Sequence, residues 1–153
     1  MLYHERGIDY RDDPYSLPLL VAHEKKEGLE AKHYREGVKA LMQALINGDS
    51  DGKPERAKIE GFSFKPFTRP NVRRMIEEKH ESIIDAFGTG AGLRLQRQDS
   101  DLALAIITNM RECGITALPV HDSFIAPKSN ETDLREEMAQ AYKEAFSFCP
   151  IIN

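Results

Sequence analysis

Apolar residues recur at helical spacing in several stretches of the chain. These stretches run over about residues 31–46, 68–87, 99–114 and from about 130 onwards. Side chains three or four positions apart share one face of an α-helix, so each stretch predicts an amphipathic helix. The apolar stripes are Val38, Leu41, Met42, Leu45 and Ile46; Val72, Met75, Ile76, Ile83, Ile84 and Phe87; Leu102, Ala103, Ile106, Ile107 and Met110; and Leu134, Met138, Ala141, Tyr142 and Ala145.

Residues that start or stop helices flank these stripes. Thr68 precedes Pro70, a position where proline is tolerated, and Asn47-Gly48 supplies a stop for the first helix. Asp99 or Ser100 is expected to cap the third helix, and Ser129 or Asn130 the fourth. The glycine-rich segment 88–92 is expected to break the chain between helices, and it lacks the Lys-Ser or Lys-Thr of a phosphate-binding loop.

Residues 115–127 follow a different pattern. Two short strand-forming runs, 115–119 and 124–127, flank the stretch 120–123, whose polar pair His121-Asp122 separates the two runs. Such spacing predicts a tight antiparallel hairpin with both polar side chains at its tip. The predicted fold class is therefore α+β, mostly helical, with a small antiparallel β-hairpin.

Composition narrows the classes of function. The chain has 153 residues, enough for one domain, with the polar segment 48–54 as the best internal boundary. A formal charge of −4 argues against a freestanding basic nucleic-acid binder. Cys113 and Cys149 lie outside any zinc-binding spacing, and the sequence has no apolar run long enough to span a membrane. We expect a cytoplasmic protein without a membrane partner.

The hairpin and its flanking helices resemble the palm of template-dependent polymerases. The order of capped helix, hairpin with His121-Asp122 at the tip, and amphipathic helix over residues 93–147 is similar to that of family A DNA polymerases and phage-type single-subunit RNA polymerases. The resemblance implies a palm-like fold and Asp122 as a catalytic ligand of Mg²⁺ or Mn²⁺. It also implies that His121 is a catalytic residue that orients the primer end or supports Asp122, that Ser123 supports the primer end, and that Gln96 and Asp99 line the primer-template groove. Without the resemblance, His121 is a structural residue packed beneath the turn and Asp99 is a helix cap. Without the resemblance, Asp122 is an ordinary turn aspartate that accepts from nearby backbone amides.

A second match lies upstream, where Arg35 and Lys39 are one helical turn apart and Asn47-Gly48 follows. In the family, an Arg and a Lys at this spacing grip the incoming triphosphate, and a tyrosine usually stands at the position of Asn47. The resemblance therefore implies nucleotide binding by Arg35, Lys39 and Asn47. The alternative is a pair of solvated charges on an exposed helix face.

A third match concerns the start of the chain, where Met1-Leu2-Tyr3 and Asp13-Pro14-Tyr15 look like the segment after the family's first catalytic aspartate. The resemblance implies that this aspartate precedes Met1. Three interpretations follow, in order of preference. The first is that the chain is a fragment of a longer polymerase-like protein, and the second is that it has lost catalysis. The third is that Asp9 or Asp13 replaces the missing aspartate.

Basic residues cluster at the start of the second predicted helix. Arg73 and Arg74, with Arg69 and Lys65, could follow a nucleic-acid backbone. Glu77, Glu78 and Glu81 lie close by, so a mixed helix surface is equally compatible.

Together these observations predict a fragment of a polymerase-like nucleotidyltransferase of phage or plasmid type, inactive or weakly active as an isolated chain. Residues 1–48 would form a partial fingers-like part and residues 60–153 a palm-like part of one domain. Its partners would be a nucleoside triphosphate and a primer-template, with DNA and RNA both open, as is the oligomeric state. The alternative is a non-enzymatic helical interaction module.

Overall fold

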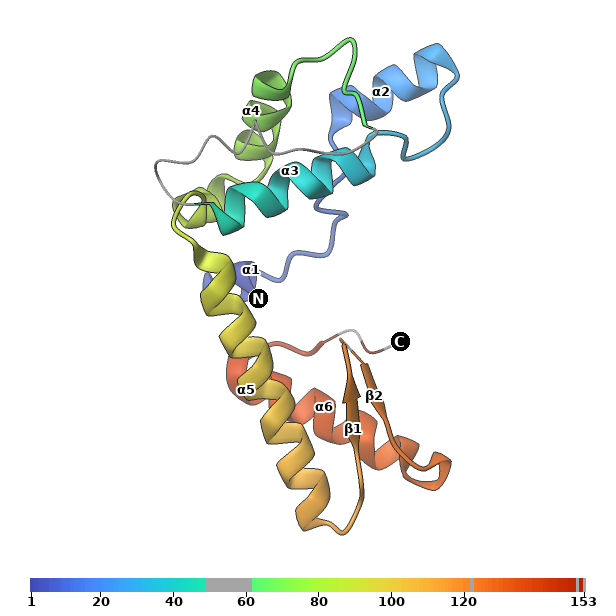
Figure 1. The fold of residues 1–153 in the computed structure, drawn as a ribbon, viewed down its shortest axis with the longest axis vertical. Helices are drawn as coiled ribbons and strands as arrows, with labels where there is room; N and C mark the ends of the chain where they lie inside the picture. Colours follow the sequence, from blue (N-terminus) through green and yellow to red (C-terminus); the bar gives the residue numbers. More distant parts are fainter. Residues whose placement is uncertain (49–61, 122, 151, 153) are drawn as a thin grey trace. The chain divides into compact units, whose positions relative to one another are not determined.

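The computed structural model describes residues 1–48, 62–121, 123–150 and Ile152. The chain divides into two compact units (Figure 1). The helical unit contains Leu2 and residues 10–93, and the hairpin unit contains Met1 and residues 3–9 and 94–153. The predicted boundary at 48–54 falls mainly outside the described residues.

The helical unit is built from α2 (Pro18–Glu27), α3 (Arg35–Asn47), α4 (Arg69–Lys79) and the 3₁₀ helix η2 (Glu81–Ala86). The apolar stripes predicted for α3 and α4 supply its core. Fully buried members of this core are Leu20, Val38, Leu41, Leu45, Val72, Ile76 and Ile83. Thr68 caps α4 as predicted, because its side chain accepts from the backbone N–H of Asn71.

The hairpin unit contains most of α1 (Leu2–Glu5) and of α5 (Ala91–Glu112), followed by β1 (Leu118–Val120), β2 (Ser123–Ile125), the 3₁₀ helix η3 (Lys128–Asn130) and α6 (Glu131–Phe146). β1 and β2 pair antiparallel, with Val120 opposite Ser123. Only two residues therefore form the turn, as the sequence predicts. Phe124 packs against a core of Ile106, Met110, Ala117, Leu134 and Ala141.

The fold class is confirmed, because the described chain is mostly helical with one small antiparallel sheet. Three details of the prediction are wrong. Helix α2 was not predicted, α5 begins at Ala91 instead of Asp99 or Ser100, and the second helix ends at Lys79, where η2 replaces its last turns. Ser100 and Asp99 lie inside α5, and the Ser100 hydroxyl donates to the carbonyl of Gln96.

The glycine-rich segment is a helix stop, as predicted, but only over its first part. Gly88 and Gly90 have left-handed backbone angles, φ +70° and +68°, which other residues adopt only at a cost. The N–H of Gly88 donates to the Leu45 carbonyl and that of Gly90 to the Gly48 carbonyl. These bonds satisfy acceptors at the end of α3, so both amides already have partners.

None of the described helices combines the length and the apolar character that a membrane crossing requires.

Candidate functional sites of the hairpin and of helix α3

The hairpin turn presents His121 in an unusual backbone conformation. Its φ is +53°, in the left-handed region where His, Asn and Asp occur more often than other non-glycine residues. Its side chain is exposed. Asp122, the predicted catalytic residue and metal ligand, lies outside the described residues.

A cavity of about 180 Å³ lies beside the turn within the hairpin unit. Its polar lining includes His121 from the turn, Asp99 from α5 and Tyr142 from α6, over an apolar wall that includes Phe124 and Met138. The structure thus places His121 at the same cavity as a carboxylate and a phenol that lie some twenty residues away on each side along the chain. Burial raises the pKa of Tyr142, with the negative charge of Asp9 as a smaller cause.

Two other predicted residues of the hairpin unit lie elsewhere. Gln96 is on the exposed face of α5, and Ser123 lines a different groove, about 720 Å³, between β2 and α6. Their role toward a primer and template stays a prediction.

Metal binding is not decided by the described side chains. No group of three or more His, Cys, Asp or Glu side chains among the described residues could hold a metal ion. Asp99 and His121 alone do not make a magnesium site, since this ion prefers oxygen ligands in octahedral geometry. The magnesium prediction therefore depends on Asp122.

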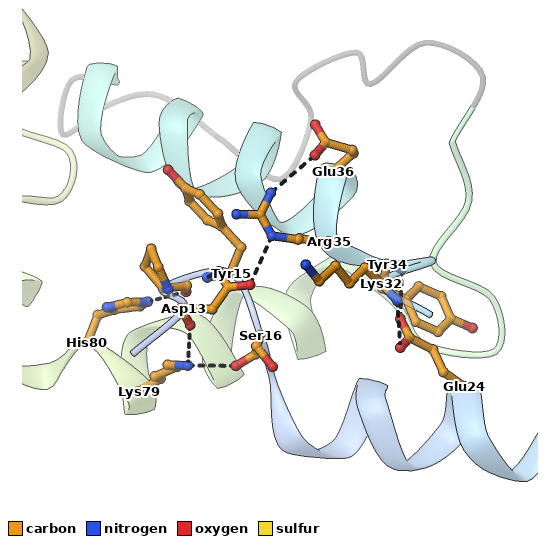
Figure 2. Close-up of polar contacts among 11 residues, drawn as sticks. Asp13, Tyr15, Ser16, Glu24, Lys32, Tyr34, Arg35, Glu36, Lys79 and His80 are labelled. Carbon is orange, nitrogen blue, oxygen red and sulfur yellow. Dashed lines mark hydrogen bonds and ion pairs between the residues drawn. The ribbon is translucent and has the colours of Figure 1, made fainter. Parts of the chain in front are cut away.

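In the helical unit, Arg35 is the first residue of α3 and is held from several sides (Figure 2). Its Nε donates to Oδ2 of Asp13 at 2.9 Å, and its Nη1 donates to Glu36 at 3.3 Å. The ring of Tyr15 lies against the guanidinium, with its centroid 4.9 Å from Cζ. Hydrogen bonding to Arg35 lowers the pKa of Asp13, and the same bond raises the pKa of Arg35.

The start of α3 is fixed by a buried carboxylate. Glu24 of α2 is only 7% exposed and accepts from the backbone N–H groups of Tyr34 at 2.9 Å and Lys32 at 3.3 Å. A negative charge at a helix N-terminus is stabilising, because the first amides have no partner within the helix. The Tyr34 hydroxyl in turn donates to the Lys65 carbonyl at 2.8 Å.

The segment that carries Asp13 is fixed by the end of α4. Lys79 Nζ donates to the carbonyls of Asp13 at 2.8 Å and Ser16 at 2.6 Å, and His80 Nε2 lies 2.9 Å from the Pro14 carbonyl oxygen (Figure 2). Because α4 is packed in the core, these bonds give the Asp13 carboxylate a rigid support.

Lys39 and Asn47, the other two predicted nucleotide-binding residues, lie on α3 with Arg35. Lys39 is half-buried, one turn after Arg35, and forms no ion pair with any residue that the structure describes. Asn47 is the last residue of α3, and its side-chain oxygen lies very close to Gly92 at the start of α5. Arg35 and Lys39 therefore lie one turn apart on α3, while the Asn47 side chain faces the start of α5.

The basic residues of α4 have local partners. Arg73 Nε lies 2.8 Å from Glu77, and Arg74 Nε lies 3.6 Å from Glu78. These i,i+4 pairs are typical of a solvated helix surface. Nucleic-acid binding by Arg73 and Arg74 stays a prediction.

Sequence reasoning did not identify Asp13 as the partner of Arg35 or Tyr142 as part of the hairpin cavity. The Asp13-Pro14-Tyr15 match drew attention to Asp13 but did not indicate its pairing with Arg35. Nothing in the sequence indicated the role of Tyr142, because this residue is one more member of an apolar stripe.

No protein-family model, curated protein or solved structure matches the chain.

Proposed function

We propose that this chain carries the palm hairpin and the triphosphate-binding helix of a polymerase-like nucleotidyltransferase, which adds nucleotides to a 3′ end under the direction of a template. The observation that supports this most is the antiparallel pairing of Val120 with Ser123, in a hairpin that follows α5 and precedes α6 along the chain. The same order of elements characterises the palm that the sequence resembles.

The proposed roles fall on five residues. Asp122 would hold a divalent cation, which supplies charge stabilisation for phosphoryl transfer when it is bound. His121 and Ser123 would support the primer end. Arg35 and Lys39 would bind the triphosphate, since a guanidinium recognises phosphate oxygens in pairs. We place the activity in the cytoplasm, where the exposed thiols of Cys113 and Cys149 would stay reduced.

Turnover by these 153 residues alone is expected to be weak or absent. Two-ion phosphoryl transfer positions ions about 3.5–4 Å apart and needs more than one carboxylate. The resemblance assigns only Asp122 within the chain. Asp13 is a poor substitute, because its carboxylate is already engaged by Arg35.

The test is a titration of the ¹⁵N-labelled chain with Mg²⁺, followed by NMR. We expect saturable shifts at residues 121–123, and we expect Asp122→Asn to abolish them. Glu136→Gln removes one carboxylate from the exposed face of α6 and serves as the matched control, with shifts unchanged. Spectra of the unsubstituted chain that do not respond to Mg²⁺ or Mn²⁺ would contradict the metal assignment.

One observation favours the second candidate, a non-enzymatic interaction module. Leu118, Val120 and Ile125 are 55%, 44% and 58% exposed on the face of the hairpin opposite Phe124. Apolar side chains gathered on one exposed face often mark a protein interface. Loss of a partner on Val120→Lys, without any response of the chain to Mg²⁺ or triphosphate, would favour this candidate.

A further inference from the structure

We infer that Asp13 is a positioning residue for the proposed triphosphate site. It fixes the Nε edge of Arg35 so that the terminal Nη1–Nη2 edge is presented to phosphate. This inference rests on the proposed role of Arg35 in triphosphate binding, and it adds a residue to which the family resemblance gives no such role.

The guanidinium of Arg35 has two edges that can bind different groups. A guanidinium has five N–H donors in a planar fork, so one anion can occupy the Nε side while another binds the terminal nitrogens. Asp13 takes Nε at 2.9 Å. Among the described residues, only Glu36 reaches the terminal edge, at 3.3 Å, and its side chain is 72% exposed. Such an exposed contact is weak and readily displaced.

Tyr15 and Asp13 restrain the guanidinium in different directions. The Tyr15 ring lies 4.9 Å from Cζ of Arg35 and limits its motion out of plane. The Tyr15 backbone N–H also donates to Oδ1 of Asp13 at 3.0 Å, so one carboxylate connects the Tyr15 backbone to the Arg35 side chain. The result is a single orientation for a side chain that would otherwise sample many rotamers.

The support beneath Asp13 comes from the core. Lys79 donates to the carbonyls on either side of Pro14 and Tyr15, and the fully buried His80 contacts the Pro14 carbonyl. A carboxylate on a segment anchored in this way can fix the arginine before any ligand arrives. When the arginine is already ordered in the free protein, less side-chain entropy is lost on binding.

The opposite hypothesis is that Asp13 masks Arg35 and repels phosphate. The two hypotheses predict opposite effects of Asp13→Ala on triphosphate binding: weaker binding if Asp13 positions Arg35, and tighter binding if Asp13 masks it. A masking carboxylate would occupy the terminal edge or both edges, whereas Asp13 contacts Nε alone. The geometry therefore favours positioning.

The experiment measures the Kd of inorganic triphosphate by calorimetry, a probe without base or sugar. We expect Asp13→Ala to weaken binding about tenfold, the scale of ordering one long side chain. Asp13→Asn should stay within about twofold of the unsubstituted chain, because its amide oxygen still accepts from Nε. Arg35→Ala should remove most binding. Glu77→Ala breaks the comparable pair with Arg73 and should change nothing.

A second measurement reports on Arg35 directly. The Nε–H resonance of Arg35 should be visible and slowly exchanging in the unsubstituted chain and in Asp13→Asn, and broadened in Asp13→Ala. Tighter binding by Asp13→Ala, or Asp13→Asn as weak as Asp13→Ala, would overturn the inference. If Arg35→Ala weakens binding while Asp13→Ala does not, only the inference fails. If the unsubstituted chain binds no triphosphate, the proposed function of α3 fails as well.

Discussion

His80 has an environment that its position along the chain does not suggest. It is fully buried at the end of α4, and its Nε2 must carry the proton to donate to the Pro14 carbonyl oxygen 2.9 Å away. Burial lowers its pKa, an effect that the adjacent Lys79 charge strengthens and the Pro14 bond partly opposes. In the unfolded chain the imidazole titrates near its ordinary value of about 6.5.

The lowered pKa predicts acid sensitivity of the helical unit. As pH falls below about 6.5, the unfolded state takes up a proton that the folded state does not, so the free energy of unfolding decreases. The loss continues until the pH reaches the lowered pKa of the folded state. Urea unfolding at several pH values, followed by signals of the helical unit, measures this slope. His80→Gln keeps a donor near Pro14 and should flatten the slope between pH 7 and 5. An equal slope in both proteins would refute the assignment.

His121 allows a second prediction at the level of one residue. A β-branched side chain is strongly disfavoured at its φ of +53°, whereas asparagine is well tolerated there. We expect His121→Val to destabilise the hairpin unit by about 1–2 kcal/mol and His121→Asn to change it little. Amide hydrogen exchange in β1 and β2 measures the difference. Equal protection in the two variants would mean that the turn adopts another conformation in solution.

The junction of α3 and α5 shows how two elements constrain each other's sequence. A Cβ built on Gly92 would lie 1.6 Å from Oδ1 of Asn47, so alanine at position 92 requires the Asn47 side chain to move. In the Asn47→Ala background this obstacle is absent. There, Gly92→Ala should stabilise the helical unit by up to about 1 kcal/mol, because alanine favours a helix over glycine.

A double-mutant cycle tests this coupling. Gly92→Ala alone should gain little or lose stability, and the interaction term between positions 47 and 92 should exceed about 0.5 kcal/mol. Ser100→Ala, at an exposed position of the same helix, controls for helix propensity and should not depend on residue 47. Additive effects at 47 and 92 would show that the two side chains do not meet.

Elements with a regular apolar period were predictable, and those shaped by distant contacts were not. α3, α4, α6 and the hairpin follow from their own patterns of residues. Helix α2 was missed because Leu19, Leu20 and Val21 are consecutive, and Leu19 is 60% exposed although it is apolar. The early start of α5 was missed because Gly92 is helical where it packs against Asn47, 45 positions away.

In the candidate sites, too, local features were predictable from the sequence and long-range contacts were not. The turn at 121–122 and the helical placement of Arg35 and Lys39 are local properties, and the sequence predicts both. The pairing of Arg35 with Asp13 spans 22 positions and depends on how α4 anchors the segment between them. No periodic pattern encodes such a bond, so only the folded chain could reveal it.

At the scale of the whole molecule, the chain has a separate core in each compact unit. Ile106 and Leu134 belong to the core of the hairpin unit, while Val38 and Leu41 are buried in the helical unit. The prediction of a single domain, with parts 1–48 and 60–153, is not decided by this division and stays a prediction. Hydrogen exchange measures the local stability of each unit residue by residue.

Shortening one buried side chain in the core of one unit tests whether the two units are energetically coupled. Ile106→Ala should cost the hairpin unit about 2–5 kcal/mol, because Ile106 is 3% exposed and alanine leaves a cavity. If the units are independent, exchange should accelerate in α6 and the hairpin while α3 and α4 keep their protection. Leu41→Ala in the fully buried core of the helical unit is the reciprocal variant and should accelerate exchange only there. Faster exchange throughout the chain in both variants would instead demonstrate one cooperative domain.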